Sequence, residues 1–201
     1  MNFFSTRISV SSRHRRIVVR RRVDAADPHH PCDSRFPAVC GILPAMTQEP
    51  QSPHIFVDAD ACPVKDETYR VARRHALRVT LVSNSWMRTP LVPWLELVVV
   101  DAQFNEADDW IVDHAGPGDI VVTADIPLAA RCLKKGAAPI APTGRVFTEA
   151  SIGNALATRD LLAGLRDLGA VTRGPAPFGK RDRSRFLHQL DEIITAVKRR
   201  R

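Results

Sequence analysis

The chain lacks long apolar runs, paired cysteines and a glycine-rich nucleotide loop. No stretch approaches the roughly 20 uncharged residues of a membrane span, so we expect a soluble protein with no membrane partner. The four cysteines show neither a CxxC pair nor a zinc-like spacing with histidine, which argues against a disulfide framework and favours a reducing, cytoplasmic setting. No GxGxxG follows the first predicted strand, which excludes a dinucleotide-binding enzyme.

The excess of positive charge belongs mostly to the start of the chain. The formal charge is +7, and residues 1–45, with eight arginines and three aspartates, supply +5 of it. The rest of the chain is close to neutral, so net charge alone does not predict a nucleic-acid partner. A chain of 201 residues, 44% of them hydrophobic, is long enough to bury a core and predicts one domain with an extension.

Residues 1–53 have no sustained helix or strand periodicity. We predict that they form a disordered or mis-annotated N-terminal extension. Met46 precedes a short polar lead-in to the first strand, and we interpret it as the candidate true start. An Arg- and Ser-rich mitochondrial presequence is the alternative. The folded domain is predicted to span residues 54–201.

From residue 54 onward, strand-like and helix-like patterns alternate, which predicts a parallel sheet with helices on both faces. The predicted strands are residues 55–58, 79–82, 95–100, 119–123 and 138–141, and prolines put the last of them at an edge. The predicted helices are residues 64–75, 105–115, 127–135, 149–168 and 183–199. The fold class is therefore α/β, a three-layer α/β/α sandwich with a mainly parallel sheet of about five strands.

Aspartates follow two of these strands and begin one helix. Asp58 and Asp60 end the first strand on the same face, Asp125 follows the fourth strand, and Asp108 and Asp109 lie in the first turns of a helix. Ligands bind to such sheets at the carboxyl ends of the strands, where the direction of the chain across the sheet reverses. Neighbouring carboxylates resist ionising together unless a cation neutralises them. These residues predict a divalent-metal site, and helix capping is the alternative for each aspartate alone.

Three segments carry a family resemblance. They are FVDADACP at 56–63, TADIPLAA at 123–130 with KGA at 135–137, and KRDRSRF at 180–186. These segments resemble the bacterial YaiI/YqxD family, also called UPF0178 or DUF188, and the resemblance runs from about residue 54 to 197. That family is similar to PIN-like domains, whose clustered carboxylates bind Mg²⁺ or Mn²⁺ and hydrolyse phosphodiester bonds in RNA.

The resemblance implies a PIN-like fold and a set of catalytic and metal-binding acids. The matching acids are Asp58, Asp60, Asp108 and Asp125, and Asp109 matches a less fixed position. Two positions depart from the family pattern. Asn105 replaces a frequent Asp before the helix acid, which removes a carboxylate from the outer shell of the site. Thr143 replaces the Arg of a Pro-Arg-Gly segment, which removes a cation that could have held a phosphate.

Polar and basic side chains near these acids are candidates for substrate contact. Ser83 and Asn84 follow the second strand and are predicted to position the water or the phosphate, or else to be turn residues. The candidate contacts with the RNA backbone are Lys180, Arg181, Arg183 and Arg185. Phe178 or Phe186 could stack on a base. In the alternative, Phe186 begins an apolar stripe and belongs to the core, Asp182 caps the helix, and Arg183 ties the helix to the acidic cleft.

The sequence thus predicts a divalent-metal-dependent ribonuclease with RNA as its partner, and two alternatives stay open. The first is a Mg²⁺-dependent phosphatase of the haloacid dehalogenase type, with Asp58 as nucleophile and Asp60 as general acid and base. Against it, residues 61–63 replace the usual Gly-Thr/Val continuation. The second is a non-catalytic RNA-binding or adaptor protein that keeps the fold.

Overall fold

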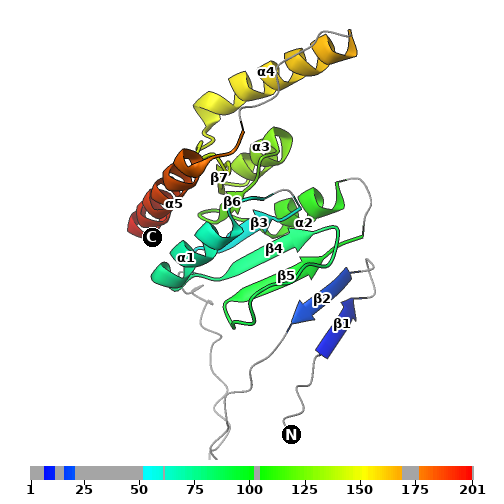
Figure 1. The fold of residues 1–201 in the computed structure, drawn as a ribbon, viewed down its shortest axis with the longest axis vertical. Helices are drawn as coiled ribbons and strands as arrows, with labels where there is room; N and C mark the ends of the chain where they lie inside the picture. The colour runs from blue at the N-terminus through cyan, green and yellow to red at the C-terminus, as the bar shows by residue number, and fades with distance from the viewer. Residues whose placement is uncertain are drawn as a thin grey trace, which may run out of the picture.

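The computed structural model describes residues 7–11, 16–20, 52–60, 62–101, 105–168 and 177–200. A single sheet forms its centre, with the strand order β1-β2-β5-β4-β3-β6-β7 (Figure 1). The strands are β1 (Arg7–Ser11), β2 (Arg16–Arg20), β3 (Ile55–Asp58), β4 (Val79–Ser83), β5 (Leu95–Val99), β6 (Ile120–Val122) and β7 (Ala138–Ile140). The helices are α1 (Lys65–His75), α2 (Glu106–His114), α3 (Ile126–Lys134), α4 (Glu149–Asp167) and α5 (Lys180–Arg200).

The five strands from β3 to β7 are all parallel, and their apolar side chains pack into two cores, one on each face of the sheet. Successive side chains of a strand point to opposite faces of the sheet. Ile55 and Val57 of β3 therefore pack with the apolar faces of α1 and α5, whereas Phe56 packs with those of α2 and α3. These two cores confirm the three-layer α/β/α fold, and β7 lies at the edge as its prolines predicted.

Helix α5 is bound to α1 by an apolar stripe. Phe186, Leu190 and Ile194 follow one another at intervals of four residues, which places them on one face of the helix, and all three are completely buried. They join the core cluster that contains Val71 and Ala72 of α1. Phe186 is therefore a core residue, which was the structural alternative to a role in base stacking.

A close turn holds the start of α5 against the sheet. Gly144 has a φ of +79°, and a Cβ built on it would lie 2.8 Å from the backbone carbon of Arg185 and 2.8 Å from the backbone nitrogen of Phe186. Only glycine combines this left-handed conformation with so close an approach of two backbones. The Pro142-Thr143-Gly144 turn and the first turns of α5 are thus packed as one unit.

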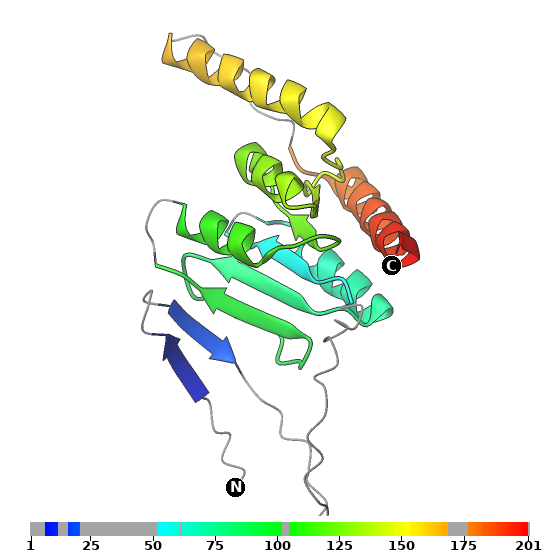
Figure 2. The ribbon, with the colours of Figure 1, turned by 180° about the vertical axis from the view of Figure 1, so that it is seen from behind.

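Helix α4 extends away from the layers of the sandwich, as Figures 1 and 2 show from opposite sides. Thr148 begins it with a capping box shared with Ser151, and Ala155 is its one buried residue. Towards its carboxyl end the leucines are uncovered, with Leu161 65% and Leu168 85% exposed. No helix within the described ranges is both long and apolar enough to cross a membrane.

The hairpin of β1 and β2 adds two antiparallel strands beside β5. Both strands lie within residues 1–53, where the sequence has no sustained periodicity, and they bring the sheet from the expected five strands to seven. Met46 and its polar lead-in up to Gln51 lie outside the described residues. That residues 1–53 are a disordered or mis-annotated extension, separate from a domain at 54–201, stays a prediction.

Candidate functional site

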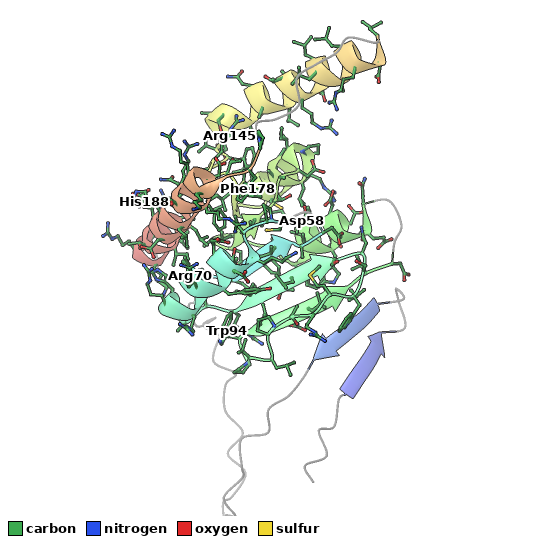
Figure 3. All side chains as sticks on the ribbon, in the orientation of Figure 1. Asp58, Arg70, Trp94, Arg145, Phe178 and His188 are labelled. Atoms are coloured by element: carbon green, nitrogen blue, oxygen red, sulfur yellow. The ribbon has the colours of Figure 1, made fainter. Side chains whose placement is uncertain are left out.

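The order of the strands creates one switch point, between β3 and β6. From β3 the chain proceeds to β4 and β5 on one side, and it then returns to β6 on the other side of β3. Asp58 is the last residue of β3, as Figure 3 shows, and Asp125 follows the end of β6 closely. These carboxylates therefore stand where parallel α/β sheets bind their ligands.

Thr123 joins these two aspartates. Its hydroxyl Oγ1 donates a hydrogen bond to Asp58 Oδ2 at 3.0 Å and accepts one from the backbone N–H of Asp125 at 2.9 Å. Thr123 is buried, whereas Asp58 and Asp125 are partly exposed, so both bonds lie at the border between the core and the solvent. The Thr123 hydroxyl thus helps to fix the Asp58 carboxylate and the backbone at Asp125. Sequence reasoning missed Thr123, although its place directly after β6 was a usable signal.

Asp60 is turned towards the end of β4. Its Oδ1 lies 2.5 Å from Ser83 Oγ, and the backbone N–H of Asn84 donates to both carboxylate oxygens, at 3.1 and 3.2 Å. Ser83 is buried, whereas Asp60 and Asn84 are exposed. In this structure Ser83 and Asn84 hold a carboxylate of the site. Their role in positioning water or phosphate stays a prediction.

Asp108 reaches the site from the first turn of α2. Burial raises its pKa to about 6, and the negative charges of Asp125 and Asp58 add to the rise, while Arg131 opposes it. Burial likewise raises the pKa of Asp58, with contributions from the charges of Asp60 and Asp125, although the hydrogen bond from Thr123 acts in the opposite direction. The predicted acids therefore lie near enough to repel one another.

Asp109, the neighbour of Asp108, does not share this environment. Its Oδ1 pairs with Arg131 Nη2 at 2.6 Å, and both side chains are largely open to solvent. The ion pair links α2 to α3. Asp109 is thus engaged with a helix partner, in keeping with its less fixed place in the family pattern.

The carboxylates fit a hard divalent cation by their chemistry. Mg²⁺ and Mn²⁺ prefer oxygen ligands, and a cation among these acids would offset the repulsion that adds to the effect of burial on the pKa values of Asp58 and Asp108. Within the part of the chain that the structure describes, no three His, Cys, Asp or Glu side chains already form a set of metal ligands. The acids are instead bonded to protein donors such as Thr123 and Ser83. Metal binding by this site, with Asp58, Asp60, Asp108 and Asp125 as ligands, stays a prediction.

Replacing Asp108 by asparagine is expected to stabilise the protein at neutral pH. A folded pKa of about 6 lies above the unfolded value of about 3.9, so this carboxyl destabilises the fold progressively as the pH rises between these values. Because Asp108 is partly exposed, we reduce the expected gain to about 1 kcal/mol, or roughly 2–4 °C in Tm. Thermal unfolding at pH 7.5 and at pH 3.5 checks it, since the gain should vanish at the lower pH.

The matched control for this substitution is Asp113→Asn, which removes an exposed acid from the same helix. It is expected to leave Tm nearly unchanged at both pH values. A gain from Asp108→Asn that persists at pH 3.5, or a loss at neutral pH, would contradict the electrostatic account of this residue.

Arg183 connects the basic start of α5 to the loop after β3. Its Nη1 donates to Glu67 Oε1 at 2.8 Å and to the carbonyl oxygen of Pro63 at 3.0 Å. Its guanidinium also lies 5.1 Å from the centre of the Phe178 ring. Arg183 therefore links α5 to the loop that follows the acidic pair, which is the structural alternative predicted for this residue. The three remaining basic candidates, Lys180, Arg181 and Arg185, are exposed.

Glu67 is the buried partner in this tie. Its side chain is 7% exposed, and its second oxygen, Oε2, has no hydrogen-bond partner among the described residues. A buried carboxylate needs a compensating charge, which Arg183 supplies. This pairing keeps the first turn of α5 next to the start of α1.

Cys62, which sits beside the acidic pair in sequence, is buried in the core that faces α1 and α5. Burial raises the pKa of its thiol to about 11. The thiol is therefore protonated at neutral pH, and a protonated buried thiol is a poor nucleophile and a poor metal ligand. Cys62 is a packing residue.

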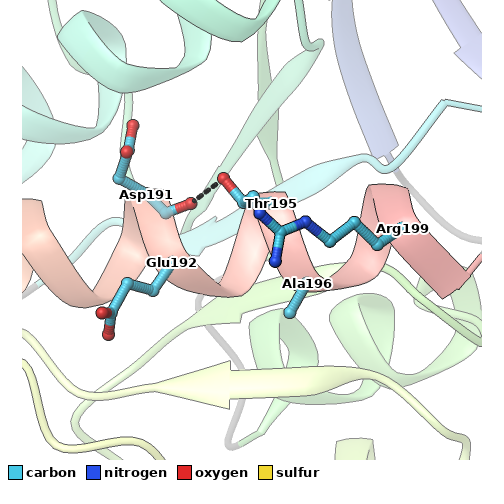
Figure 4. A pocket seen from close by; sticks show the side chains of 5 residues that line it. All are labelled: Asp191, Glu192, Thr195, Ala196 and Arg199. Carbon is cyan, nitrogen blue, oxygen red and sulfur yellow. Dashed lines mark hydrogen bonds between the residues drawn. The ribbon is translucent and has the colours of Figure 1, made fainter.

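A surface hollow lies elsewhere, along the last turns of α5 (Figure 4). It has a volume of about 330 Å³ and is lined by Asp191, Glu192, Thr195, Ala196 and Arg199. Thr195 Oγ1 donates to the backbone oxygen of Asp191 at 2.8 Å, an ordinary bond within a helix. None of the predicted site residues lines this hollow, so it is not part of the candidate site.

Comparison with known proteins identifies one family. Residues 56–196 match the family described as "Uncharacterized BCR, YaiI/YqxD family". The chain is 57% identical over 145 residues to a UPF0178 protein of Caulobacter vibrioides, covering 72% of this chain and 95% of that protein. It is 56% identical over 147 residues to one of Rhodopseudomonas palustris, covering 73% and 93%. No solved structure matches.

Proposed function

The chain belongs to the YaiI/YqxD family, and from that premise we propose that it is a divalent-metal-dependent ribonuclease of the PIN-like kind, which hydrolyses phosphodiester bonds in RNA. One observation carries the proposal. Asp58, Asp108 and Asp125 come from three different elements and meet at the switch point of the sheet, where their charges act on one another. Aspartates that only capped separate helices would not need to lie close to one another.

The residues that would hold the metal follow from their positions. Asp58 and Asp125 are the main ligands in our proposal, because Thr123 bonds the carboxylate of Asp58 and the backbone N–H of Asp125 and so links the ends of β3 and β6. Asp60 and Asp108 bind directly or through water. When bound, Mg²⁺ or Mn²⁺ lowers the pKa of a water and offsets charge on the scissile phosphate.

No covalent nucleophile is needed for this hydrolysis. The side chains of the protein bind the cation, orient the phosphate and keep the attacking water in line with the leaving oxygen. Ser83 and Asn84 support this arrangement by fixing Asp60, since the carboxylate accepts bonds from both residues.

The exposed cations at the start of α5 support RNA as the substrate. Lys180, Arg181 and Arg185 project from the turn that Arg183 ties to Pro63, three residues after Asp60. Cations in that place can pair with successive phosphates of a single strand that enters the acidic site. The net charge of the chain does not reveal these cations, because the acidic residues of the domain cancel their charge.

The test is cleavage of end-labelled single-stranded RNA by the full chain in Mn²⁺, compared with Asp125→Asn. We expect cleavage by the wild type and its loss in the variant, with circular dichroism unchanged. Equal cleavage by both proteins would point to a contaminant and contradict the proposal. Asp113→Asn is the control, since it removes an exposed acid near the carboxyl end of α2, at the opposite end of the helix from Asp108, and should cleave normally.

Two other results would favour the alternatives. An aspartyl-phosphate trapped on Asp58 after incubation with a phosphoryl donor would identify a phosphatase of the haloacid dehalogenase type. RNA binding that survives Asp125→Asn, without metal-dependent turnover in either protein, would identify a non-catalytic RNA-binding protein.

A further inference from the structure

Lys65 places a positive charge at the rim of the acidic site. It is the first residue of α1, and its Nζ donates to the carbonyl oxygen of Ala59 at 2.9 Å. Ala59 lies between Asp58 and Asp60, and Lys65 is half-buried. The ammonium group is therefore held at the carboxyl end of β3, beside the backbone between Asp58 and Asp60.

The electrostatics of α1 do not account for a lysine at this position. The amino end of a helix carries a partial positive charge, so a cation there is unfavourable, whereas acids such as Asp66 are favourable. The negative charges of the site offset this cost.

Lys65 also differs from the neighbouring cations in its bonding. Arg183 is paired with Glu67, and Arg131 is paired with Asp109. Lys65 instead donates to a neutral carbonyl, and among the described residues it forms no ion pair within 4.0 Å. An ammonium has three N–H donors, so a bond to Ala59 leaves donors for an anionic ligand.

We propose that Lys65 is the phosphate-binding cation of the acidic site, and that it contacts a non-bridging oxygen of the RNA phosphate placed there. The inference rests on the proposed function. A phosphate that approaches four carboxylates is repelled unless cations stand beside it, and Lys65 supplies a permanent one next to the metal.

The test measures RNA binding in the absence of cleavage. Fluorescence anisotropy of a short labelled single-stranded RNA is recorded in Ca²⁺ with the full chain, over a series of salt concentrations. For Lys65→Met we expect roughly tenfold weaker binding at low salt. The slope of log K against log salt should become shallower by about 0.7, the value for one lost contact with a single strand. Lys65→Arg should restore most of both quantities.

Lys198→Met is the matched control. The Nζ of Lys198 also donates to a backbone carbonyl, that of His75 at 2.8 Å, but at the other end of α1. Lys198→Met should leave the slope unchanged. A loss of RNA binding that appears in both variants would reflect the total charge of the protein and contradict a specific contact by Lys65. Should Lys65→Met fail to fold, Lys65→Gln keeps a donor for Ala59 and removes only the charge.

The outcomes separate this inference from the proposed function. A slope that depends on Lys65, without any cleavage in Mn²⁺, would support the phosphate contact and overturn the nuclease. Cleavage by the wild type together with an unchanged slope in folded Lys65→Met would overturn the contact alone. A wild type that binds no RNA would overturn both.

Discussion

Replacing Asp58 by asparagine is expected to reduce Mn²⁺-dependent RNA cleavage at least about 100-fold, a loss typical of removing one electrostatic group from an active site. Asparagine keeps the shape of the side chain and an acceptor for the hydroxyl of Thr123, so the change is one of charge. The cleavage rate at saturating RNA and Mn²⁺ gives the measurement. Asp113→Asn should retain the rate of the wild type.

The same variant is expected to be no less stable than the wild type. Burial raises the pKa of Asp58, as do the charges of Asp60 and Asp125, so the ionised carboxylate opposes folding at neutral pH. Mn²⁺ should raise the Tm of the wild type and have less effect on the variant, because a cation stabilises the state that binds it. A rate that stays within a few-fold of the wild type would remove Asp58 from the proposed mechanism.

Truncating Phe186 to alanine is expected to destabilise the protein by about 3–5 kcal/mol, the range for a large aromatic side chain in a close-packed core. Phe186 is completely buried, and it packs with Leu190 and Ile194 in the core that α5 shares with α1. The backbone at Phe186 also meets the tight turn at Gly144, which prevents the helix from moving in to fill the space. Urea unfolding followed by circular dichroism measures the loss.

Phe178→Ala is the informative comparison for this truncation. Phe178 is half-buried, and its ring lies under the guanidinium of Arg183, so its removal should cost about 1 kcal/mol or somewhat more. A loss below 1 kcal/mol for Phe186→Ala would mean that α5 is not anchored through this side chain. The pair thus separates the core phenylalanine from the partly buried one under Arg183, whose stacking on a base stays a prediction.

The fold was largely predictable because its central strands are short apolar runs between turn signals. The order of the predicted elements from residue 54 onward is observed, with ends that differ by one or two residues in most cases. The start of α5 was predicted at 183 but lies at Lys180. Asp182 caps the helix, as the structural alternative predicts, but from inside the first turn. Its Oδ2 accepts the backbone N–H of Gly179 at 2.9 Å, as the acid of a capping box does.

The acids of the candidate site were predictable because each ends a strand or begins a helix. The specific contacts of Thr123 and Lys65 were not, because they cross the fold; the place of Thr123 directly after β6 indicated only that it lies near the site. Thr123 meets Asp58 only when β6 pairs with β3, and Lys65 meets Ala59 only when α1 folds back over the end of the strand. Periodicity describes which face of an element a residue occupies, and such contacts require the neighbouring element as well.

The hydrogen bond between Thr123 and Asp58 joins residues that are 65 positions apart in the chain. During synthesis β3 leaves the ribosome before β4, β5 and α2, and all of them precede β6, which then takes its place at the free edge of β3. A nascent chain therefore carries Asp58 and Asp60 without their counterparts. The acidic site is assembled only once the second half of the sheet has docked, so a partly made chain lacks the site that we propose for a metal and an RNA phosphate.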